Sequence, residues 1–412
     1  MHARLVILAL LPLLHSAVRS SYNDTRISLQ SISSDVAVSA VHIAQVSNST
    51  ETSLAEVSSE DSFPNEKAAR QSLLTAFGDK YRFNHKFLRF LAHSKLGEGA
   101  FGVVWKAIKK SQGLKVAIKQ QPLPTGNDEK SEKLLASMQS EAEIQELVSG
   151  VPYVMPLIEI KSDATYFYTV MPLAQGWQNS YDLKTLSSPL TGSSFQLVAA
   201  QMALAIRGIH LKGVAHLDIK ADNFLLDGEM PSLSGRGKTP KVHLADFGVS
   251  LKSDTKPLAG REAEFSFSIH EKERGSRYYW PAELGGSFYD PWSWNVDWFE
   301  FGVTLLTLAA GEAVLPKKGF AHMDAAFLHK DLDQIQPNIR IGDETLAKSL
   351  IDLLKKKLLV PDRSERFSSF NIEDYSGDGA AGFNDAFWKH DFWQINGRPL
   401  GSEGWQQFSE QG

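Results

Sequence analysis

Cysteine is absent from the 412 residues of the chain, which excludes disulfide bonds, thiolate metal sites and thiol catalysis. Long runs of Lys or Arg are missing too, and the formal net charge is −5 at pH 7. The chain therefore lacks the concentrated basic surface that nucleic-acid binding requires. Its hydrophobic share of 42% and charged share of 22% are ordinary for a globular protein. Composition thus predicts one large or two modest domains with a sizeable core and no nucleic-acid partner.

An apolar run stands at the N-terminus. Residues 5–14 are almost entirely apolar, follow His2 and Arg4, and precede small residues at positions 16, 17 and 20. This pattern is typical of a secretory signal peptide, and the run is too short for a stable transmembrane helix. We therefore predict a signal peptide over residues 1–20 and a secreted protein. Without disulfides, such a protein must be stabilised by its core alone or must act in a reducing compartment.

The composition changes along the rest of the chain. Residues 21–62 are rich in Ser, Thr, Asn and acids, which predicts a flexible pro-region or linker. Residues 63–90 interleave aromatic and basic side chains, and this pattern allows either contact with a membrane surface or packing on the next domain. The number of aromatics favours packing. From residue 91 short β-branched runs dominate, and beyond residue 180 helical periodicity takes over, so we expect two lobes.

A glycine-rich segment, Gly97-Glu98-Gly99-Ala100-Phe101-Gly102, lies between two predicted strands. Glycines allow backbone amides to approach phosphate oxygens because no side chain intervenes. An ordinary hairpin could also use them, whereas a dinucleotide-binding loop requires a helix directly after the last glycine. The segment that follows, 103–108, has the pattern of a strand.

Lys119 ends the apolar run Val116-Ala117-Ile118, where its ammonium can reach back under the glycine loop to phosphates. Such a lysine needs a carboxylate partner, and the predicted helix 133–148 offers two. Glu141 shares a helix face with apolar residues, whereas Glu143 lies on the polar side. We therefore predict an ion pair between Lys119 and Glu141.

The segment His216-Leu217-Asp218-Ile219-Lys220-Ala221-Asp222-Asn223 carries several polar groups at close spacing. Asp218 is placed to accept or orient a substrate hydroxyl, Lys220 to steady a transferring phosphoryl group, and Asn223 to hold a metal. Downstream, Asp246-Phe247-Gly248 follows a predicted strand. We expect Asp246 to bind Mg²⁺, because carboxylate oxygens suit a hard cation.

These motifs occur in the order typical of protein kinases, and from about residue 90 to 393 the sequence resembles that family. The resemblance implies an α+β, bilobal kinase fold with a small β-rich N-lobe containing helix αC and a larger helical C-lobe. It also implies ATP and Mg²⁺ as cofactors, protein substrates and a monomer. Asp218, Lys220, Lys119 and Glu141 would be catalytic, and Asn223 and Asp246 would hold the metal. The ATP-binding residues would be Gly97, Gly99, Gly102, Val104, Ala117, Lys119, Met171, Pro172 and Ala174.

The expected organisation follows from the same resemblance. It comprises a signal peptide at 1–20, a pro-region at 21–62, an extension at 63–90, the N-lobe at 91–175, the C-lobe at 176–395 and a tail at 396–412. Residues 275–283 look like the end of a kinase activation segment, with Glu283 expected to pair with Arg366. Residues 297–302 resemble the buried helix that anchors the catalytic loop. Residues 228–241 predict a surface loop, because they are rich in Gly, Ser and Pro.

Two positions bear on regulation and specificity. Leu217 stands where kinases commonly carry an arginine that binds an activation-loop phosphate, so we expect activity without that switch. Lys220, together with Ser276, is typical of Ser/Thr-directed members and disfavours tyrosine specificity.

The combination of signal peptide, Ser-rich pro-region and intact kinase motifs resembles the rhoptry kinases, which apicomplexan parasites inject into host cells. Residues 216–226 support this resemblance, as does Ser53-Leu54-Ala55-Glu56, which is similar to a rhoptry maturation site. It implies host proteins as substrates and a location in the rhoptry and then the host cell. A pseudokinase scaffold and a kinase of the secretory lumen are the alternatives.

Overall fold

The computed structural model describes residues 66–83, 95–99, 102–176, 180–186, 188–231, 238–253, 275–281, 284, 294–315, 325–342, 344–363, 365–367, 369 and 386–395. The predicted signal peptide, pro-region and C-terminal tail lie outside these residues. No helix within the described ranges combines the length and apolarity needed to cross a bilayer.

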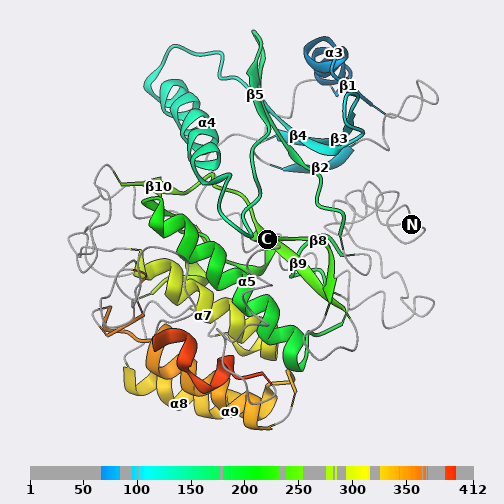
Figure 1. Ribbon diagram of the computed structural model, residues 1–412. Coiled ribbons are helices and arrows are strands. Elements are labelled where there is room, and N and C mark those ends of the chain that lie inside the picture. The colour runs from blue at the N-terminus through cyan, green and yellow to red at the C-terminus, as the bar shows by residue number, and fades with distance from the viewer. Residues whose placement is uncertain are drawn as a thin grey trace, which may run out of the picture. The chain divides into compact units, whose positions relative to one another are not determined.

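The N-terminal part of the described chain forms a six-stranded antiparallel sheet (Figure 1). The strand order is β1-β3-β4-β6-β5, and β2 also pairs with β3. The elements of this part are α3 (Glu66–Phe77), β1 (Tyr81–Arg82), β2 (Lys95–Gly99), β3 (Gly102–Lys109), β4 (Lys115–Pro122), α4 (Glu129–Val148), β5 (Glu159–Ser162) and β6 (Tyr166–Pro172).

Helices α3 and α4 lie on opposite faces of β4. Successive side chains of a strand point to opposite faces, so Lys119 and Gln120 mark the two sides. The Gln120 amide donates to the carbonyl oxygen of Ala69 in α3 at 2.9 Å, whereas the Lys119 ammonium contacts Glu141 in α4 at 2.6 Å. The sheet is therefore covered on both faces, which explains why Val116, Ala117 and Ile118 are all buried.

Helix α4 begins at a side-chain cap. The carboxylate of Asp128 accepts a hydrogen bond from the Ser131 amide at 2.9 Å, and Glu129 and Glu132 add negative charge to the first turn. Both features stabilise the N-terminus of a helix, because its first amides have no internal partner. The predicted helix 133–148 lies within α4, which starts one turn earlier.

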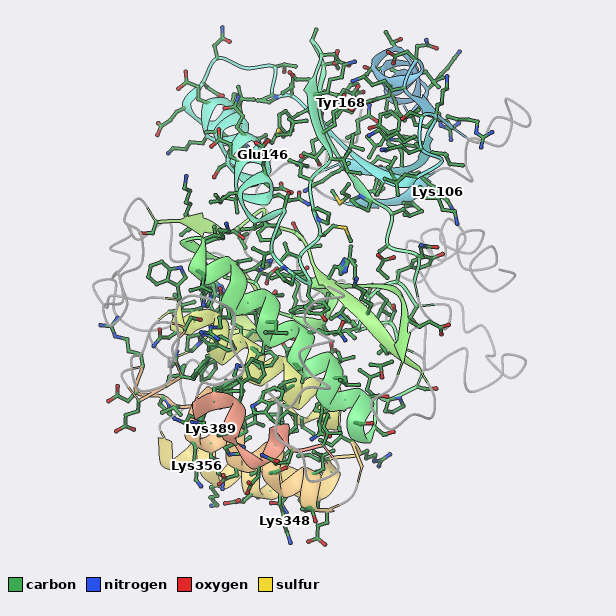
Figure 2. The ribbon with its side chains drawn as sticks, viewed as in Figure 1. Lys106, Glu146, Tyr168, Lys348, Lys356 and Lys389 are labelled. Carbon is green, nitrogen blue, oxygen red and sulfur yellow. The ribbon has the colours of Figure 1, made fainter. Side chains whose placement is uncertain are left out.

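The predicted extension belongs to this sheet structurally. β1 pairs with β3, and α3 buries Ala69, Leu73 and Phe77. The Phe77 ring packs edge-on against Tyr168 of β6, which is labelled in Figure 2, at a centroid distance of 5.2 Å. The apolar side chains of residues 66–83 are thus used inside the protein. Of the two interpretations of residues 63–90, the structure supports packing for the described residues 66–83.

The C-terminal part is mainly helical. Its elements are α5 (Gly192–Leu211), β7 (Val214–Ala215), η2 (Ala221–Asn223), β8 (Phe224–Pro231), β9 (Lys238–Leu244), β10 (Leu251–Lys252), η4 (Arg277–Tyr279), α7 (Asn295–Ala310), η5 (Glu312–Val314), α8 (Ala325–Ile335), η6 (Gln336–Asn338), α9 (Glu344–Leu353), the π-helical turn η7 (Leu354–Leu358), η8 (Ala386–Lys389) and η9 (Asp391–Trp393).

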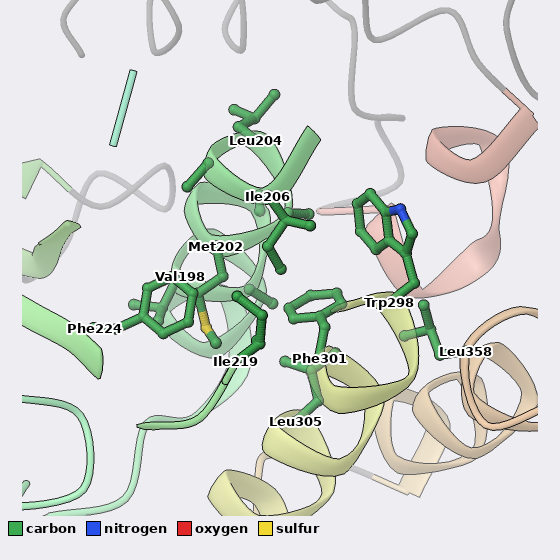
Figure 3. Close-up of a cluster of buried hydrophobic side chains, with 14 of the residues drawn as sticks. Val198, Met202, Leu204, Ile206, Ile219, Phe224, Trp298, Phe301, Leu305 and Leu358 are labelled. Atoms are coloured by element: carbon green, nitrogen blue, oxygen red, sulfur yellow. The ribbon is translucent and has the colours of Figure 1, made fainter. Parts of the chain in front are cut away.

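Helices α5 and α7 form the centre of this part. Figure 3 shows Val198, Met202 and Ile206 of α5 close to Phe301 and Leu305 of α7. Both helices are buried along almost their whole length, because β7 and β9 pack against α5, η5 and η7 pack against α7, and aromatic rings of η9 and η8 contact α5 and α7 respectively. A helix buried on all sides presents no polar face to water, so polar groups on α7 must find partners inside the protein.

The predicted surface loop at residues 228–241 is wrong at both ends. β8 continues to Pro231 and pairs with β9, with Glu229 opposite Pro240. Gly228 has a φ of +77°, and the strand register shifts between Leu226 and Glu229. A glycine with positive φ accommodates such a bulge, after which pairing resumes. The Gly and Pro content therefore marks a bulged hairpin, whose tip at 232–237 lies outside the described residues.

Replacing Phe77 with Ala should lower the free energy of unfolding by about 3 kcal/mol or more, because a fully buried aromatic side chain is lost. Thr75→Ala, an exposed change on the same helix, should alter it by less than about 0.5 kcal/mol. Urea denaturation of both variants tests this. Equal stability of the two would show that α3 does not contribute to the core.

Candidate active site

The glycine-rich segment forms a β2–β3 hairpin. Gly97 is opposite Val104, and Gly99 is opposite Gly102. Gly102 has a φ of +137°, and a Cβ atom there would lie 2.2 Å from the carbonyl oxygen of Gln120. Any other residue would therefore clash with β4. No helix follows Gly102, which rules out the dinucleotide-binding interpretation, and residues 100 and 101 lie outside the described part.

Lys119 lies next to this hairpin, opposite Val104 across the β3–β4 pair. Its Nζ is 2.6 Å from Oε1 of Glu141, and the two side chains are 18% and 11% exposed. The attraction between the two charges is strong because both side chains are mostly buried, and it holds them in a defined position. The predicted ion pair is therefore present, and Glu143 faces solvent as the helix periodicity indicated.

The remaining predicted ATP-binding residues lie on the same sheet and just beyond it. Ala117 is opposite Met171 of β6, and Pro172 ends that strand. Ala174 is buried in a small apolar cluster with Ala245, the residue that precedes Asp246. The structure thus brings the segment after β6 against Ala245, which lies between the end of β9 and the predicted metal ligand Asp246.

Asp218, Lys220 and Asn223 converge on one point. Lys220 Nζ lies 2.8 Å from Asp218 Oδ2, and the amide nitrogen of Asn223 donates to Asp218 Oδ2 at 3.1 Å and to its carbonyl oxygen at 2.8 Å. Lys220 also donates to Ser276 Oγ at 3.0 Å. Asp218 Oδ1 is buried and has no hydrogen-bond partner among the described residues. An unused acceptor beside two ordered donors is suited to receive a hydroxyl proton.

The ionisation of Asp218 reflects two opposing effects. Burial alone raises the pKa of a carboxyl group, but the Lys220 ammonium, the hydrogen bonds from Lys220 and Ser276, and the charge of His216 lower it. The net pKa of Asp218 lies below its ordinary value. Asp218 is therefore an anion at neutral pH, able to orient a hydroxyl group.

Asp246 lies beside Asn223 because of the β8–β9 pairing. Phe224 is opposite Leu244, and the Ala245 amide donates to the Asn223 carbonyl at 2.9 Å, so Asn223 and Asp246 leave the hairpin at the same end. The Asp246 side chain is exposed. A Cβ atom on Gly248 would lie 3.3 Å from Asp246 Oδ1 and 3.7 Å from Glu141 Oε2. The Lys119–Glu141 pair and Asp246 therefore flank one small space.

The donor set fits a magnesium ion. Asn223 uses its amide nitrogen for Asp218, which leaves its oxygen as a ligand, and Asp246 supplies a carboxylate. Within the described ranges, no group of three or more His, Asp or Glu side chains could hold a metal alone. A cation here would need phosphate and water oxygens as well, which is how Mg²⁺ binds nucleotide sites.

Asp297 of α7 holds the catalytic loop in place. Its Oδ2 accepts the His216 amide at 2.7 Å and faces His210 Nε2 at 2.8 Å, and its Oδ1 accepts the Leu217 amide at 2.7 Å. Leu217 has a φ of +65°, which is costly for a branched residue. These two charge-assisted backbone bonds offset that cost. Residues 297–302 thus anchor the loop, as the resemblance implied.

Leu217 makes an apolar contact where an arginine is common. Its side chain is buried in a cluster with Trp280, Leu284 and Trp294. Gly275 crosses the loop closely, because a Cβ atom there would be 2.0 Å from the Leu217 carbonyl oxygen. The C-terminal end of the activation segment, around Gly275 and Trp280, is therefore held by packing and close backbone approach.

Arg366 is buried against backbone carbonyls. It donates to the Val360 carbonyl from Nε at 3.0 Å and from Nη2 at 2.8 Å, and its guanidinium lies 4.9 Å from the centroid of the Phe299 ring. Its predicted partner Glu283 lies outside the described residues. That pairing stays a prediction.

Glu300 is a buried acid that sequence analysis did not identify. Its Oε2 accepts the Ile219 amide at 2.8 Å, while Oε1 has no partner among the described residues. Burial, followed by the charges of Asp297 and Asp218, raises the pKa of Glu300 well above its ordinary value. Glu300 therefore keeps its proton to an unusually high pH. Its signal in the sequence is an acid in a mostly apolar helix that also carries Asp297.

Comparison with known proteins identifies the family. Residues 90–376 match the protein kinase domain, so the chain belongs to the protein kinase family. It is 28% identical over 283 residues to "Serine/threonine-protein kinase ULK3" of Xenopus laevis, covering 68% of this chain and 53% of that protein. It is 24% identical over 263 residues to "Serine/threonine/tyrosine-protein kinase HT1" of Arabidopsis thaliana, covering 63% and 60%.

A third similar protein is "Serine/threonine-protein kinase srk1" of Schizosaccharomyces pombe (strain 972 / ATCC 24843), which is 29% identical over 250 residues, covering 53% of this chain and 40% of the relative. The chain thus spans about half the length of these curated relatives. The bilobal α+β fold inferred from the motifs is confirmed by the family match and by the sheet and helices described above.

Lys119→Met should lower kcat by about 10²–10³, because the charge that stabilises phosphate oxygens is lost. Its cost in unfolding free energy should be only about 1–2 kcal/mol, from the unpaired Glu141. Lys106→Met, an exposed change on β3 (Figure 2), is the matched control and should leave both quantities nearly unchanged. Steady-state kinetics and urea denaturation measure the two effects. A loss of rate matched by an equal loss of stability would contradict a catalytic role.

Glu300→Gln should change how stability depends on pH. A carboxyl whose pKa is raised by folding stabilises the protein fully below its ordinary pKa, and this contribution is lost as the pH rises towards the raised value. The wild type should therefore lose up to about 1.4 kcal/mol per pH unit over that window relative to Glu300→Gln. Denaturation at several pH values between 5 and 8 tests this. Glu146→Gln, an exposed change on α4, serves as control, and parallel curves for Glu300→Gln and wild type would contradict the raised pKa.

Proposed function

We propose that this protein is a secreted Ser/Thr protein kinase, delivered from the rhoptries of an apicomplexan parasite, that phosphorylates host-cell proteins. The single observation that carries the catalytic part is the contact set of Asp218, Lys220, Asn223 and Ser276. The family match and the names of the Ser/Thr kinases to which the chain is similar support the same activity.

In the proposed reaction, ATP is a substrate bound under the β2–β3 hairpin. The substrate hydroxyl oxygen attacks the γ-phosphorus, the bond from that phosphorus to the bridging oxygen breaks, and ADP leaves with the electron pair. Asp218 orients the hydroxyl and receives its proton. Lys220 stabilises the charge on the transferring group, and Lys119, held by Glu141, does so on the α- and β-phosphates.

Magnesium would neutralise charge on the phosphate oxygens when bound by Asn223 and Asp246. The remaining contributions come from positioning and electrostatics, since phosphoryl transfer requires no covalent step on the protein. Serine or threonine acceptors are favoured by the Lys220–Ser276 contact, which is the geometric counterpart of the sequence pattern. A pseudokinase scaffold is disfavoured, because Lys119, Asp218, Asn223 and Asp246 are all present.

Secretion and host delivery are supported by sequence alone. The apolar N-terminal run, the Ser-rich residues 21–62 and the absence of cysteine all agree with passage through a secretory organelle to a reducing cytosol. A kinase of the secretory lumen shares the first two features. The location of the substrates is what separates the two proposals.

A tagged wild-type protein and an Asp218→Asn variant should both reach the host cell, whereas only the wild type should increase host Ser/Thr phosphorylation. Microscopy of infected cells and phosphoproteomics of the host fraction measure these outcomes. The conservative change keeps the Asn223 and Lys220 contacts close to their present geometry. Retention inside the parasite's secretory pathway would contradict host delivery, and phosphorylation by the Asp218→Asn variant would contradict the mechanism.

A further inference from the structure

A cavity of about 890 Å³ lies beside the catalytic loop among the described residues. One wall is the segment between Leu183 and Leu190, and another is the end of α7 with η5, residues 307–314. Ala221, which belongs to the catalytic loop, and Tyr279 also line the cavity. The cavity is large enough for more than one amino-acid side chain.

The cavity is close to the place where a substrate hydroxyl must sit. Ala221 comes three residues after Asp218, and Tyr279 comes three residues after Ser276, whose hydroxyl contacts Lys220. An extended polypeptide advances about 3.3–3.6 Å per residue. A substrate whose Ser or Thr reaches Asp218 can therefore place a side chain a few residues away into this cavity.

The cavity surface is apolar over slightly more than half of its area. Its lining includes Leu183, Leu186, Pro189, Leu190 and Leu308. The Tyr279 hydroxyl stays neutral, because burial and the nearby Glu312 charge raise its pKa. Such a lining favours burial of an aliphatic side chain.

A partly exposed lysine neutralises two acids at the edge of the cavity. Lys184 Nζ lies 3.1 Å from Asp222 Oδ1 and 3.5 Å from Glu312 Oε1. Burial lowers the pKa of Lys184, but the two carboxylates raise it by more, so this lysine stays charged. Arg340 adds a second positive charge to the lining. Two acids and two bases leave no net charge to attract an ionic side chain.

We propose that this cavity is a substrate subsite for an uncharged, apolar side chain near the phosphorylated Ser or Thr, and that Lys184 excludes basic side chains by occupying the Asp222–Glu312 carboxylate pair. The proposal rests on the protein-kinase activity proposed above. The occupant is a segment of the substrate protein, because Ala221 of the loop that positions the hydroxyl also lines the cavity. Lys184 is thus a specificity determinant rather than a catalytic residue.

The test is a peptide library with one central Ser, phosphorylated by the full chain, in which each flanking position is varied in turn. The wild type should select Leu, Ile, Met or Val over Arg and Lys at one position within about four residues of the Ser. Lys184→Met, which keeps length but removes charge, should shift that same position towards Arg or Lys by roughly fivefold to tenfold in relative kcat/KM. Lys356→Met, an exposed paired lysine labelled in Figure 2, should retain the wild-type selection.

Two further variants test the carboxylate pair and the cavity volume separately. Adding Glu312→Gln to Lys184→Met should remove the new basic preference, because only one carboxylate is left. Ala313→Trp, which fills the cavity, should raise the KM for apolar peptides several-fold while ATP hydrolysis without peptide stays unchanged. ATP hydrolysis also distinguishes failure of the subsite proposal from failure of the proposed kinase activity. If the folded wild type hydrolysed no ATP, the proposed kinase activity itself would be contradicted. An unchanged selection in Lys184→Met, or an unchanged peptide KM in Ala313→Trp, would overturn the subsite.

Discussion

The arrangement of the active site depends on a single buried carboxylate. Asp297, which is completely buried in α7, accepts the amides of His216 and Leu217 and faces the ring of His210. A carboxylate taken out of water is stable only if its oxygens are well satisfied, and these three partners satisfy it. In return it fixes Leu217 in a left-handed conformation, from which Asp218 projects towards Lys220 and Asn223. Helix α7 can hold this charge rigidly because α5 packs along it.

A second constraint acts through the sheet. The side chains of Lys119 and Gln120 point to opposite faces of β4. This strand therefore contacts α4 through an ion pair and α3 through a buried amide. Helix α3 therefore stabilises the same strand that presents the phosphate-binding lysine. Stability and catalysis are linked here by neighbouring residues, although each contact can be altered separately.

Sequence analysis succeeded where the chemistry depends on local order. The choice of Glu141 over Glu143 followed from helix periodicity, because a one-sided helix has one buried face. It failed for residues 228–241, since Gly228 and Pro240 are compatible with either a loop or a bulged hairpin. It also missed Glu300 and the Lys184–Asp222–Glu312 contact, whose partners are distant in sequence and are brought together only by the tertiary fold. Residues 63–90 were open to two interpretations because an amphipathic pattern does not say what covers its apolar face.

The apolar cluster around Leu217 differs from an arginine–phosphate contact in how it can be reversed. An arginine bound to a phosphorylated residue forms a clamp that a phosphatase can open and that salt weakens. Leu217, Trp280, Leu284 and Trp294 instead exclude water from their shared contacts, and salt does not screen this attraction as it screens an ion pair. A clamp of this kind offers no chemical group for a reversing enzyme to remove. Dephosphorylation elsewhere in the chain would therefore leave this contact intact.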